Sequence, residues 1–195
     1  MVGCAAPQKG VSTLDYLRDK REFSTMSFYG SSELQERVKM FGRVDLHSPY
    51  GANTSDLTRF NGRIRATKDM SENFGLVIEG KDSSGDNNNV ASLGFSYKPT
   101  FPFPVEVRVF PARTDGTHEA GLNFRKSFGK GNIKPYVNGI LDVKEDGEDL
   151  TTSGECQIGL EAGSWKIFLT ERYSDLDRRK GIDNPGIAGG LGIKF

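Results

Sequence analysis

Apolar and polar residues alternate along the chain from about residue 38 to its end, with the period of two that is typical of β-strands. Each stretch of alternation predicts a strand with one apolar and one polar face. We expect about ten such strands, at residues 39–47, 57–67, 74–81, 91–98, 105–109, 120–125, 137–143, 155–161, 165–170 and 186–195. No convincing helical pattern follows residue 38. The chain is therefore predicted to be all-β, with consecutive strands paired antiparallel.

These strands have no helices to cover the edges of their sheet, so the sheet must close on itself or aggregate. The sequence thus predicts an up-and-down antiparallel β-barrel of about ten strands. A soluble, lipocalin-like barrel would turn its apolar faces inward, whereas a membrane barrel turns them toward lipid. The polar faces favour the membrane barrel, because they interleave charges of both signs with small residues that suit a crowded lumen. Against it, the apolar stripes are short for the ~9–11 residues of a membrane strand.

The connections between the predicted strands also alternate in length. Those after the first, third, fifth, seventh and ninth strands are polar and mostly longer, and the others are mostly shorter. With an even number of strands, this asymmetry places both chain ends on the side of the short turns, as in bacterial outer-membrane barrels.

The last predicted strand ends in an aromatic residue on its apolar face. That face holds Ile187, Gly189, Leu191, Ile193 and Phe195, and small or charged residues occupy the other. The strand resembles the C-terminal strand of bacterial outer-membrane β-barrel proteins. The resemblance implies that Phe195 belongs to the signal read by the outer-membrane assembly machinery, and that the protein lies in membrane lipid. The alternatives are an edge strand of a soluble sheet and, if Met1 is native, an organelle outer membrane.

The beginning of the chain lacks the alternation, and we expect three segments. Residues 1–11 are predicted to be a flexible arm, residues 12–24 a short amphipathic helix and residues 25–195 the barrel domain. Ser12 and Asp15 favour the helix, because they suit its cap and its first turn.

The stretch from Val2 to Ala5 resembles the end of a bacterial lipoprotein signal, in which the cysteine is lipidated after cleavage. The resemblance implies that Cys4 is a lipid anchor. The leucine that usually stands three places before that cysteine is missing, because Met1 occupies the position. An unmodified cysteine in a flexible tail is the alternative.

Arginines gather on the polar faces of the predicted strands: Arg59, Arg63 and Arg65 on one strand, and Arg43, Arg108 and Arg125 on others. In a membrane barrel they would line the lumen, where they can interact with anions or acidic saccharides. The chain resembles outer-membrane channels for acidic oligosaccharides in this respect. Four carboxylates are predicted to form ion pairs in the same lumen: Glu79, Glu106, Glu155 and Glu161. The alternative is a packed interior with no passage, since barrels of ~8 strands are filled by side chains.

Composition and motifs point away from several other functions. Lys and Arg together number 26, as do Asp and Glu, so no net field favours nucleic acid. The two histidines, His47 and His118, have no partners at metal-ligand spacing, and no catalytic motif accompanies them. We therefore predict no catalytic site, no metal and no cofactor.

The predicted function is a narrow channel or export component of the outer membrane with an arginine-bearing lumen. Two alternatives stay open at this point. One is a non-conducting structural or interaction barrel in the same membrane, and the other is a soluble lipocalin-like binder of an apolar ligand.

Overall fold

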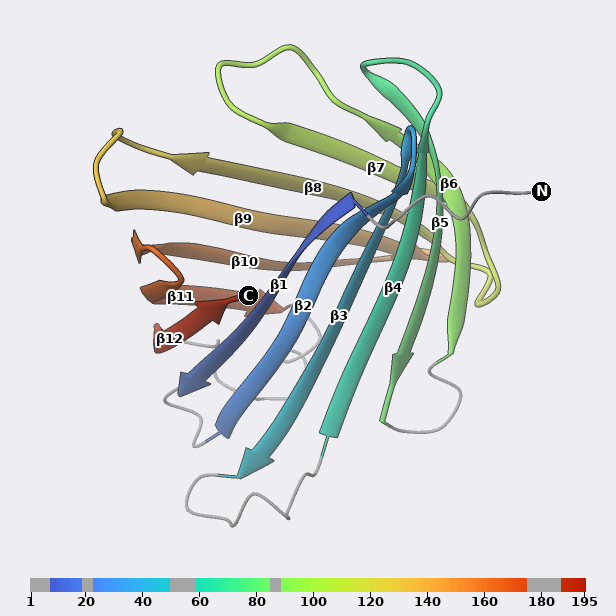
Figure 1. The fold of residues 1–195 in the computed structure, drawn as a ribbon. Helices are drawn as coiled ribbons and strands as arrows, with labels where there is room; N and C mark the ends of the chain where they lie inside the picture. The colour runs from blue at the N-terminus through green and yellow to red at the C-terminus, as the bar shows by residue number, and fades with distance from the viewer. Residues whose placement is uncertain (1–7, 19–22, 50–58, 85–88, 175–186) are drawn as a thin grey trace, which may run out of the picture.

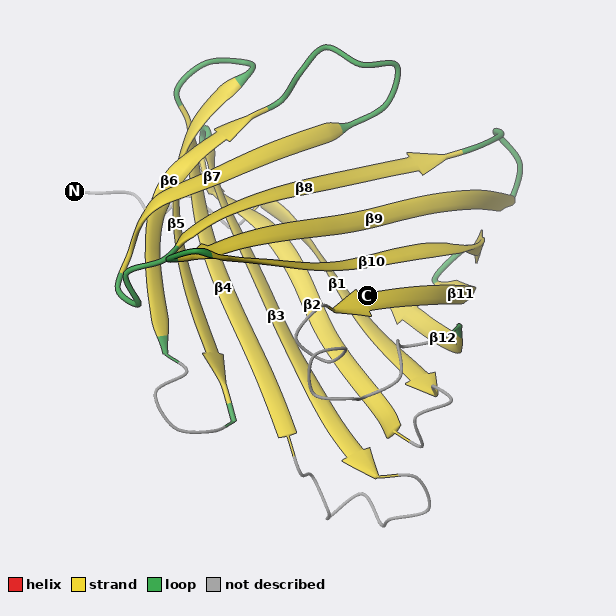
Figure 2. Ribbon diagram, turned by 180° about the vertical axis from the view of Figure 1, so that it is seen from behind, coloured by secondary structure: helices red, strands yellow, loops and turns green. Residues whose placement is uncertain are grey.

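The computed structural model describes residues 8–18, 23–49, 59–84, 89–174 and 187–195. They form one closed antiparallel barrel, in which each strand pairs with its neighbours in sequence and the last strand pairs with the first (Figure 1). The strands are β1 (Gln8–Arg18), β2 (Phe23–Gln35), β3 (Val38–Pro49), β4 (Arg59–Asp69), β5 (Phe74–Ser83), β6 (Val90–Tyr97), β7 (Val105–Arg113), β8 (His118–Ser127), β9 (Ile133–Asp146), β10 (Asp149–Ala162), β11 (Trp165–Ser174) and β12 (Ala188–Lys194). Over the described ranges there is no helix (Figure 2), and thus none that is long and apolar enough to cross a membrane.

Twelve strands are present instead of about ten, and the two additional strands lie where an arm and a helix were expected. β1 occupies residues 8–18 and β2 begins at Phe23, so the predicted helix over residues 12–24 is wrong. Thr13, Asp15 and Leu17 are buried in alternation with exposed or half-buried neighbours, which is the period of a strand. The physical reason is closure, because β1 pairs with both β12 and β2, whereas a helix would leave two sheet edges unpaired.

The apolar faces of the strands point out of the barrel and the polar faces point into it. Leu93 is 47% exposed and Ile167 is 56% exposed, whereas Glu79 and Arg108 are each 1% exposed. The predicted membrane-barrel orientation is confirmed, and the alternative of a lipocalin-like barrel with an apolar interior is wrong. The strands are 7 to 14 residues long. Most of them reach the ~9–11 residues of a membrane span, because they extend beyond the short apolar stripes.

The start of β1 and the end of β12 lie at the same rim of the barrel, called the terminal rim below. Its connections are residues 36–37, 70–73, 98–104, 128–132 and 163–164. The connections at the opposite rim are residues 19–22, 50–58, 84–89, 114–117, 147–148 and 175–187. The two longest are at the opposite rim, as predicted, but the asymmetry is incomplete, because 98–104 is longer than 114–117.

A buried ion pair fastens the seam where β12 joins its neighbours. The Nζ atom of Lys166 on β11 lies 2.7 Å from Oδ2 of Asp15 on β1, and both side chains are almost fully buried. Gly192 of β12 is paired in register with both residues. A Cβ atom at Gly192 would lie 2.2 Å from Asp15 Oδ1 and 2.4 Å from Lys166 Cε. Glycine at this position therefore lets the ion pair pass over the strand.

We expect Gly192→Ala to lower the free energy of unfolding by on the order of 3 kcal/mol, because the added methyl group displaces a buried ion pair. Urea unfolding of the refolded barrel in detergent micelles measures the change. Gly189→Ala is the matched control, since nothing lies within 4 Å of the Cβ position of Gly189 on the same strand. Equal stability of the two variants would contradict this account of the seam.

Candidate functional site

The barrel encloses a cavity of about 1660 Å³ that reaches from Phe101 and Phe103 at the terminal rim to Arg59 at the opposite rim. Twelve lysines and arginines line it among the described residues: Lys39, Arg43, Arg59, Arg63, Arg65, Lys81, Lys98, Arg108, Arg113, Arg125, Lys144 and Arg172. Seven acidic residues of the same ranges line it: Asp15, Asp45, Asp82, Glu106, Asp115, Asp142 and Glu155. The lining itself therefore carries five more positive than negative charges. Four carboxylates of the described residues that are not part of the lining pair with some of its cations: Asp69, Glu79, Glu119 and Glu161.

The structure places all six arginines singled out in the sequence in this lining, together with Glu106 and Glu155. Glu79 and Glu161 lie beneath it, 1% and 9% exposed. Sequence analysis did not single out Lys81 or Asp142, although both lie on the polar faces of predicted strands. Their position on the polar face could have identified Lys81 and Asp142 as lumen residues, but it does not show which charges form ion pairs across the barrel.

Glu79 on β5 is the most enclosed carboxylate among the described residues of the lumen, and three cations surround it. The Nη2 atom of Arg65 lies 2.5 Å from Oε2 of Glu79. Lys81 Nζ and Arg63 Nε lie 3.4 Å and 3.8 Å from Oε1. Arg65 also stacks over the ring of Phe41, with its guanidinium carbon 5.3 Å from the ring centroid. A buried carboxylate needs such partners, and these three cations supply them.

Ion pairs at the terminal rim join residues of the same wall. Asp69 accepts hydrogen bonds from Lys39 at 2.8 Å and from Lys98 at 2.6 Å. Glu161 pairs with Lys194 at 2.7 Å and also with Arg125. These contacts connect strands that lie close together around the barrel, so they stabilise the rim without crossing the cavity.

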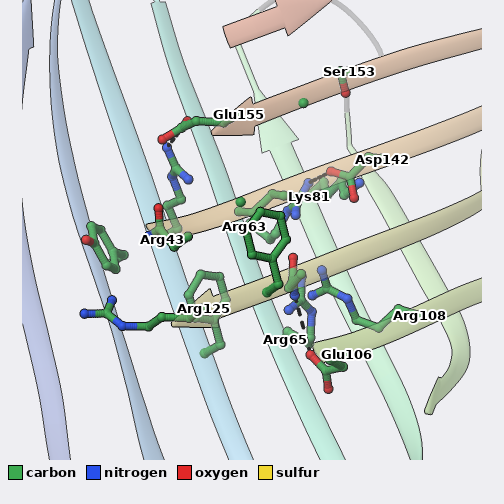
Figure 3. A pocket seen from close by; sticks show the side chains of 18 of the residues that line it. Arg43, Arg63, Arg65, Lys81, Glu106, Arg108, Arg125, Asp142, Ser153 and Glu155 are labelled. Carbon is green, nitrogen blue, oxygen red and sulfur yellow. Dashed lines mark hydrogen bonds and ion pairs between the residues drawn. The ribbon is translucent and has the colours of Figure 1, made fainter. Parts of the chain in front are cut away.

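Two other ion pairs cross the lumen. Arg43 Nη2 on β3 lies 3.5 Å from Glu155 Oε2 on β10, and Arg63 Nη2 on β4 lies 3.3 Å from Asp142 Oδ2 on β9. In both cases four strands lie between the partners along the shorter way around the barrel. Figure 3 shows the arginines reaching from one wall toward the carboxylates of the other.

Arg108 on β7 is a buried cation with an incomplete set of partners. It is 1% exposed, and its Nε and Nη1 atoms have no hydrogen-bond partner among the described residues. Burying a charge without partners is costly. Arg108 also lines the cavity, so it is a cation of the lumen wall whose hydrogen-bonding capacity is not filled.

Asp115, in the connection between β7 and β8, is held ionised at the opposite rim. The side chain of Arg113 donates hydrogen bonds to it, as does Thr117, and these lower the pKa of the carboxyl below its usual range. Arg113 Nη2 lies 3.0 Å from Asp115 Oδ2. The pair fixes a lining arginine at the mouth of the cavity.

The histidines have ordinary hydrogen-bonding contacts. His47 Nδ1 lies 2.9 Å from Thr25 Oγ1, and His118 Nδ1 lies 3.0 Å from the carbonyl oxygen of Pro111. Within the described part of the chain, no three His, Cys, Asp or Glu side chains are grouped so that they could hold a metal ion.

No protein-family model matches this chain, and no curated protein sequence matches it either. Solved structures do. A KdgM porin is 12% identical with a TM-score of 0.60, and a KdgM porin in complex with disordered oligogalacturonate is 12% identical with a TM-score of 0.59; each match covers 95% of this chain and 99% of the porin. A NanC porin is 10% identical with a TM-score of 0.55, over 96% of this chain and 99% of the porin. The chain has the fold of these porins. The coverage shows that the likeness extends over the whole barrel.

We expect Arg108→Met to raise the free energy of unfolding by about 1 to 3 kcal/mol, because methionine fills the site without burying an unpaired charge. Arg65→Met is the comparison, since it removes the 2.5 Å pair with Glu79 and should lower stability by on the order of 2 kcal/mol. Urea unfolding in detergent micelles measures both. A similar loss in the two variants would show that Arg108 has a stabilising partner after all.

Proposed function

We propose that the protein is a channel of the bacterial outer membrane that passes small anions, acidic saccharides in particular. The observation that carries this proposal is the excess of five positive charges among the described residues that line the cavity. A cleft lined by one sign of charge raises the local concentration of the opposite ion, and charged side chains in a pore select among ions in the same way.

The lining arginines suit carboxylates by geometry as well as by charge. A guanidinium can hold a carboxylate through two parallel hydrogen bonds. Arg59 lies at the opposite rim, Arg63 in the middle and Arg125 toward the terminal rim. A series of such positions lets an anion move from one to the next, provided that no single one holds it too tightly.

The solved structures with this fold support the same ligand class. One of them is a KdgM porin in complex with disordered oligogalacturonate, an acidic saccharide. Oligogalacturonate is the ligand of the KdgM porin and not an observed ligand of this chain. For this chain, the class of acidic saccharides is supported by the charge of the lining, because a ligand with several carboxylates would find several cations within reach.

The outer surface suits membrane lipid, because the exposed faces of the strands are apolar, as at Ile64, Ile158 and Leu191. Phe195 is 73% exposed, and its backbone N–H donates to the carbonyl of Ser12 at 2.9 Å. We propose Phe195 as part of the signal read by the assembly machinery. Cys4 lies outside the described residues, and its lipidation stays a prediction.

A second candidate is a non-conducting barrel with a structural or interaction role in the same membrane. The observation that favours it is the pair of ion bridges across the lumen, Arg43–Glu155 and Arg63–Asp142. Bridges that never open would leave no path for a solute.

Recording of the reconstituted protein in planar lipid bilayers separates the two candidates. We expect anion-selective conductance, and we expect Arg59→Gln/Arg125→Gln to lower the anion-to-cation permeability ratio at least about twofold, because two lining cations are lost. The ratio is measured from the reversal potential in a salt gradient.

Lys68→Gln/Lys130→Gln is the matched control, because it removes the same charge from residues that do not line the cavity. Its permeability ratio should stay at the wild-type value. Absence of current from correctly folded, inserted protein at low and at high salt would reject the channel and leave the structural barrel.

A further inference from the structure

A row of like charges crosses the wall formed by β3, β4 and β5. Arg43 is paired in register with Arg63, and Arg63 is paired with Lys81. All three residues line the cavity. Like charges on directly opposed residues of neighbouring strands destabilise each other, so this row needs negative partners.

Arg43 and Arg63 find their negative partners on the other side of the lumen, and Lys81 finds its partner on β8, with only β6 and β7 between. The three ion pairs are Arg43–Glu155 at 3.5 Å, Arg63–Asp142 at 3.3 Å and Lys81–Glu119 at 2.5 Å. Their strands are nested, with β3 paired to β10, β4 to β9 and β5 to β8 through these side chains, so the three pairs form one series. Figure 3 shows the two of them that cross the lumen. We call these three pairs the lumen belt.

Nearly every belt residue also has a second partner close to it on its own wall. These same-wall pairs are Arg43–Asp45, Glu155–Arg172, Arg63–Glu79, Lys81–Glu79 and Glu119–Arg113. Breaking a buried ion pair is costly when it leaves a charge without a partner. A belt pair whose members both have a second partner can therefore separate without that cost.

Asp142 has no such same-wall ion pair among the described residues, but Arg108 lies beside it. Gly121 is paired in register with both. Its Cβ position lies 2.7 Å from Asp142 Oδ1 and 3.6 Å from Arg108 Nη2. Because glycine has no side chain, the carboxylate and the guanidinium have open space between them. Rotation of Asp142 away from Arg63 brings it to the cation whose Nε and Nη1 atoms lack partners.

The two belt pairs that cross the lumen are also partly exposed to solvent, so their side chains can exchange one ionic partner for another. The side chains of Arg43 and Arg63 are 21% and 23% exposed, and those of Glu155 and Asp142 are 22% and 17% exposed. Partly hydrated pairs of this kind contribute little net stability and are weakened by salt. The enclosed pair of Arg65 with Glu79, by contrast, is short and almost fully buried.

We propose that the lumen belt is a gate, which opens when an anion replaces Glu155 and Asp142 on Arg43 and Arg63. The released carboxylates pair with cations of their own wall, Asp142 with Arg108. An oligosaccharide with several carboxylates suits this exchange better than a monovalent anion, because it replaces both carboxylates at once. The gate rests on the proposed channel function and adds to it the step by which the cavity becomes passable.

The dependence of single-channel conductance on salt tests the gate. Between about 0.1 M and about 1 M KCl, wild-type conductance should rise at least ~3-fold more than the conductivity of the solution, because salt screens the belt pairs. Asp142→Asn/Glu155→Gln removes two belt carboxylates, so its conductance should follow the solution conductivity. Recordings use protein whose barrel is shown to be folded by its heat-modifiable migration on gels.

The matched control is Glu36→Gln/Glu148→Gln, which removes the same charge from exposed residues that do not line the cavity. It should keep the wild-type salt dependence. If the belt variant keeps it too, the gate is wrong while the channel stands. If neither wild-type protein nor the belt variant carries current, the proposed function itself fails.

Arg108→Met tests the exchange at Asp142, with trigalacturonate as the probe. At low salt, the trisaccharide should raise the open fraction of the wild-type channel at least about threefold, whereas Arg108→Met should respond at least about threefold less. Heat-modifiable migration of this variant on gels separates a weaker response from unfolding. An equal response would overturn the exchange between Arg63 and Arg108.

Discussion

A strand in lipid must have its backbone amides and carbonyls paired within the protein, and the rest of this structure follows from that constraint. β12 meets it by pairing with β1 as well as β11. The last residue continues the ladder, because the N–H of Phe195 donates to Ser12. Side chains support the closure from inside, where Lys166 and Asp15 meet over Gly192. The glycines of the final strand are thus part of the closing mechanism.

Closure with apolar faces outward reverses the usual relation between burial and polarity. The buried side chains of the described residues are mostly polar or charged, and few apolar ones, such as Leu17, Tyr136 and Phe168, are buried. Charges in such an interior must find partners. The geometry of these ion pairs differs with their place in the barrel. Enclosed pairs such as Arg65–Glu79 are short, whereas the pairs that cross the cavity are longer and more exposed to solvent. The first kind holds the wall together, and the second kind can exchange partners.

The alternation of residues was sufficient to predict ten of the twelve strands, their antiparallel order and the direction of their charged faces. It failed for β1 because Ser12 and Asp15 imitate the start of a helix, and because Leu17 turns inward while Tyr16 turns outward. It failed for β2 because its inward face begins with Thr25 and Ser27, which are small and only weakly polar. In both strands the hydrophobic contrast between the faces is low, so tertiary pairing and not local pattern decides the structure.

The same reasoning explains which part of the site a sequence can reveal. The alternation of side chains along a strand places Arg43 and Arg63 on the lumen side, because this alternation depends only on neighbours in the chain. The partners Glu155 and Asp142 depend on which strands face each other after closure, and that follows from the number and register of all twelve strands.

Those two additional strands also decide whether space remains between the walls. A smaller barrel is filled by its side chains, and here one wall is kept thin by glycines. Gly190 and Gly192 leave room for Phe168 and for the Lys166–Asp15 pair. Packing therefore fills the lumen beside these glycines, whereas the contacts of Arg43 with Glu155 and of Arg63 with Asp142 across the cavity are ionic. Packed rings cannot give way to a solute without loss of stability, whereas an ion pair can give way to another ion of the same charge. In the proposed channel, passage would for that reason depend on charge exchange and not on movement of the wall.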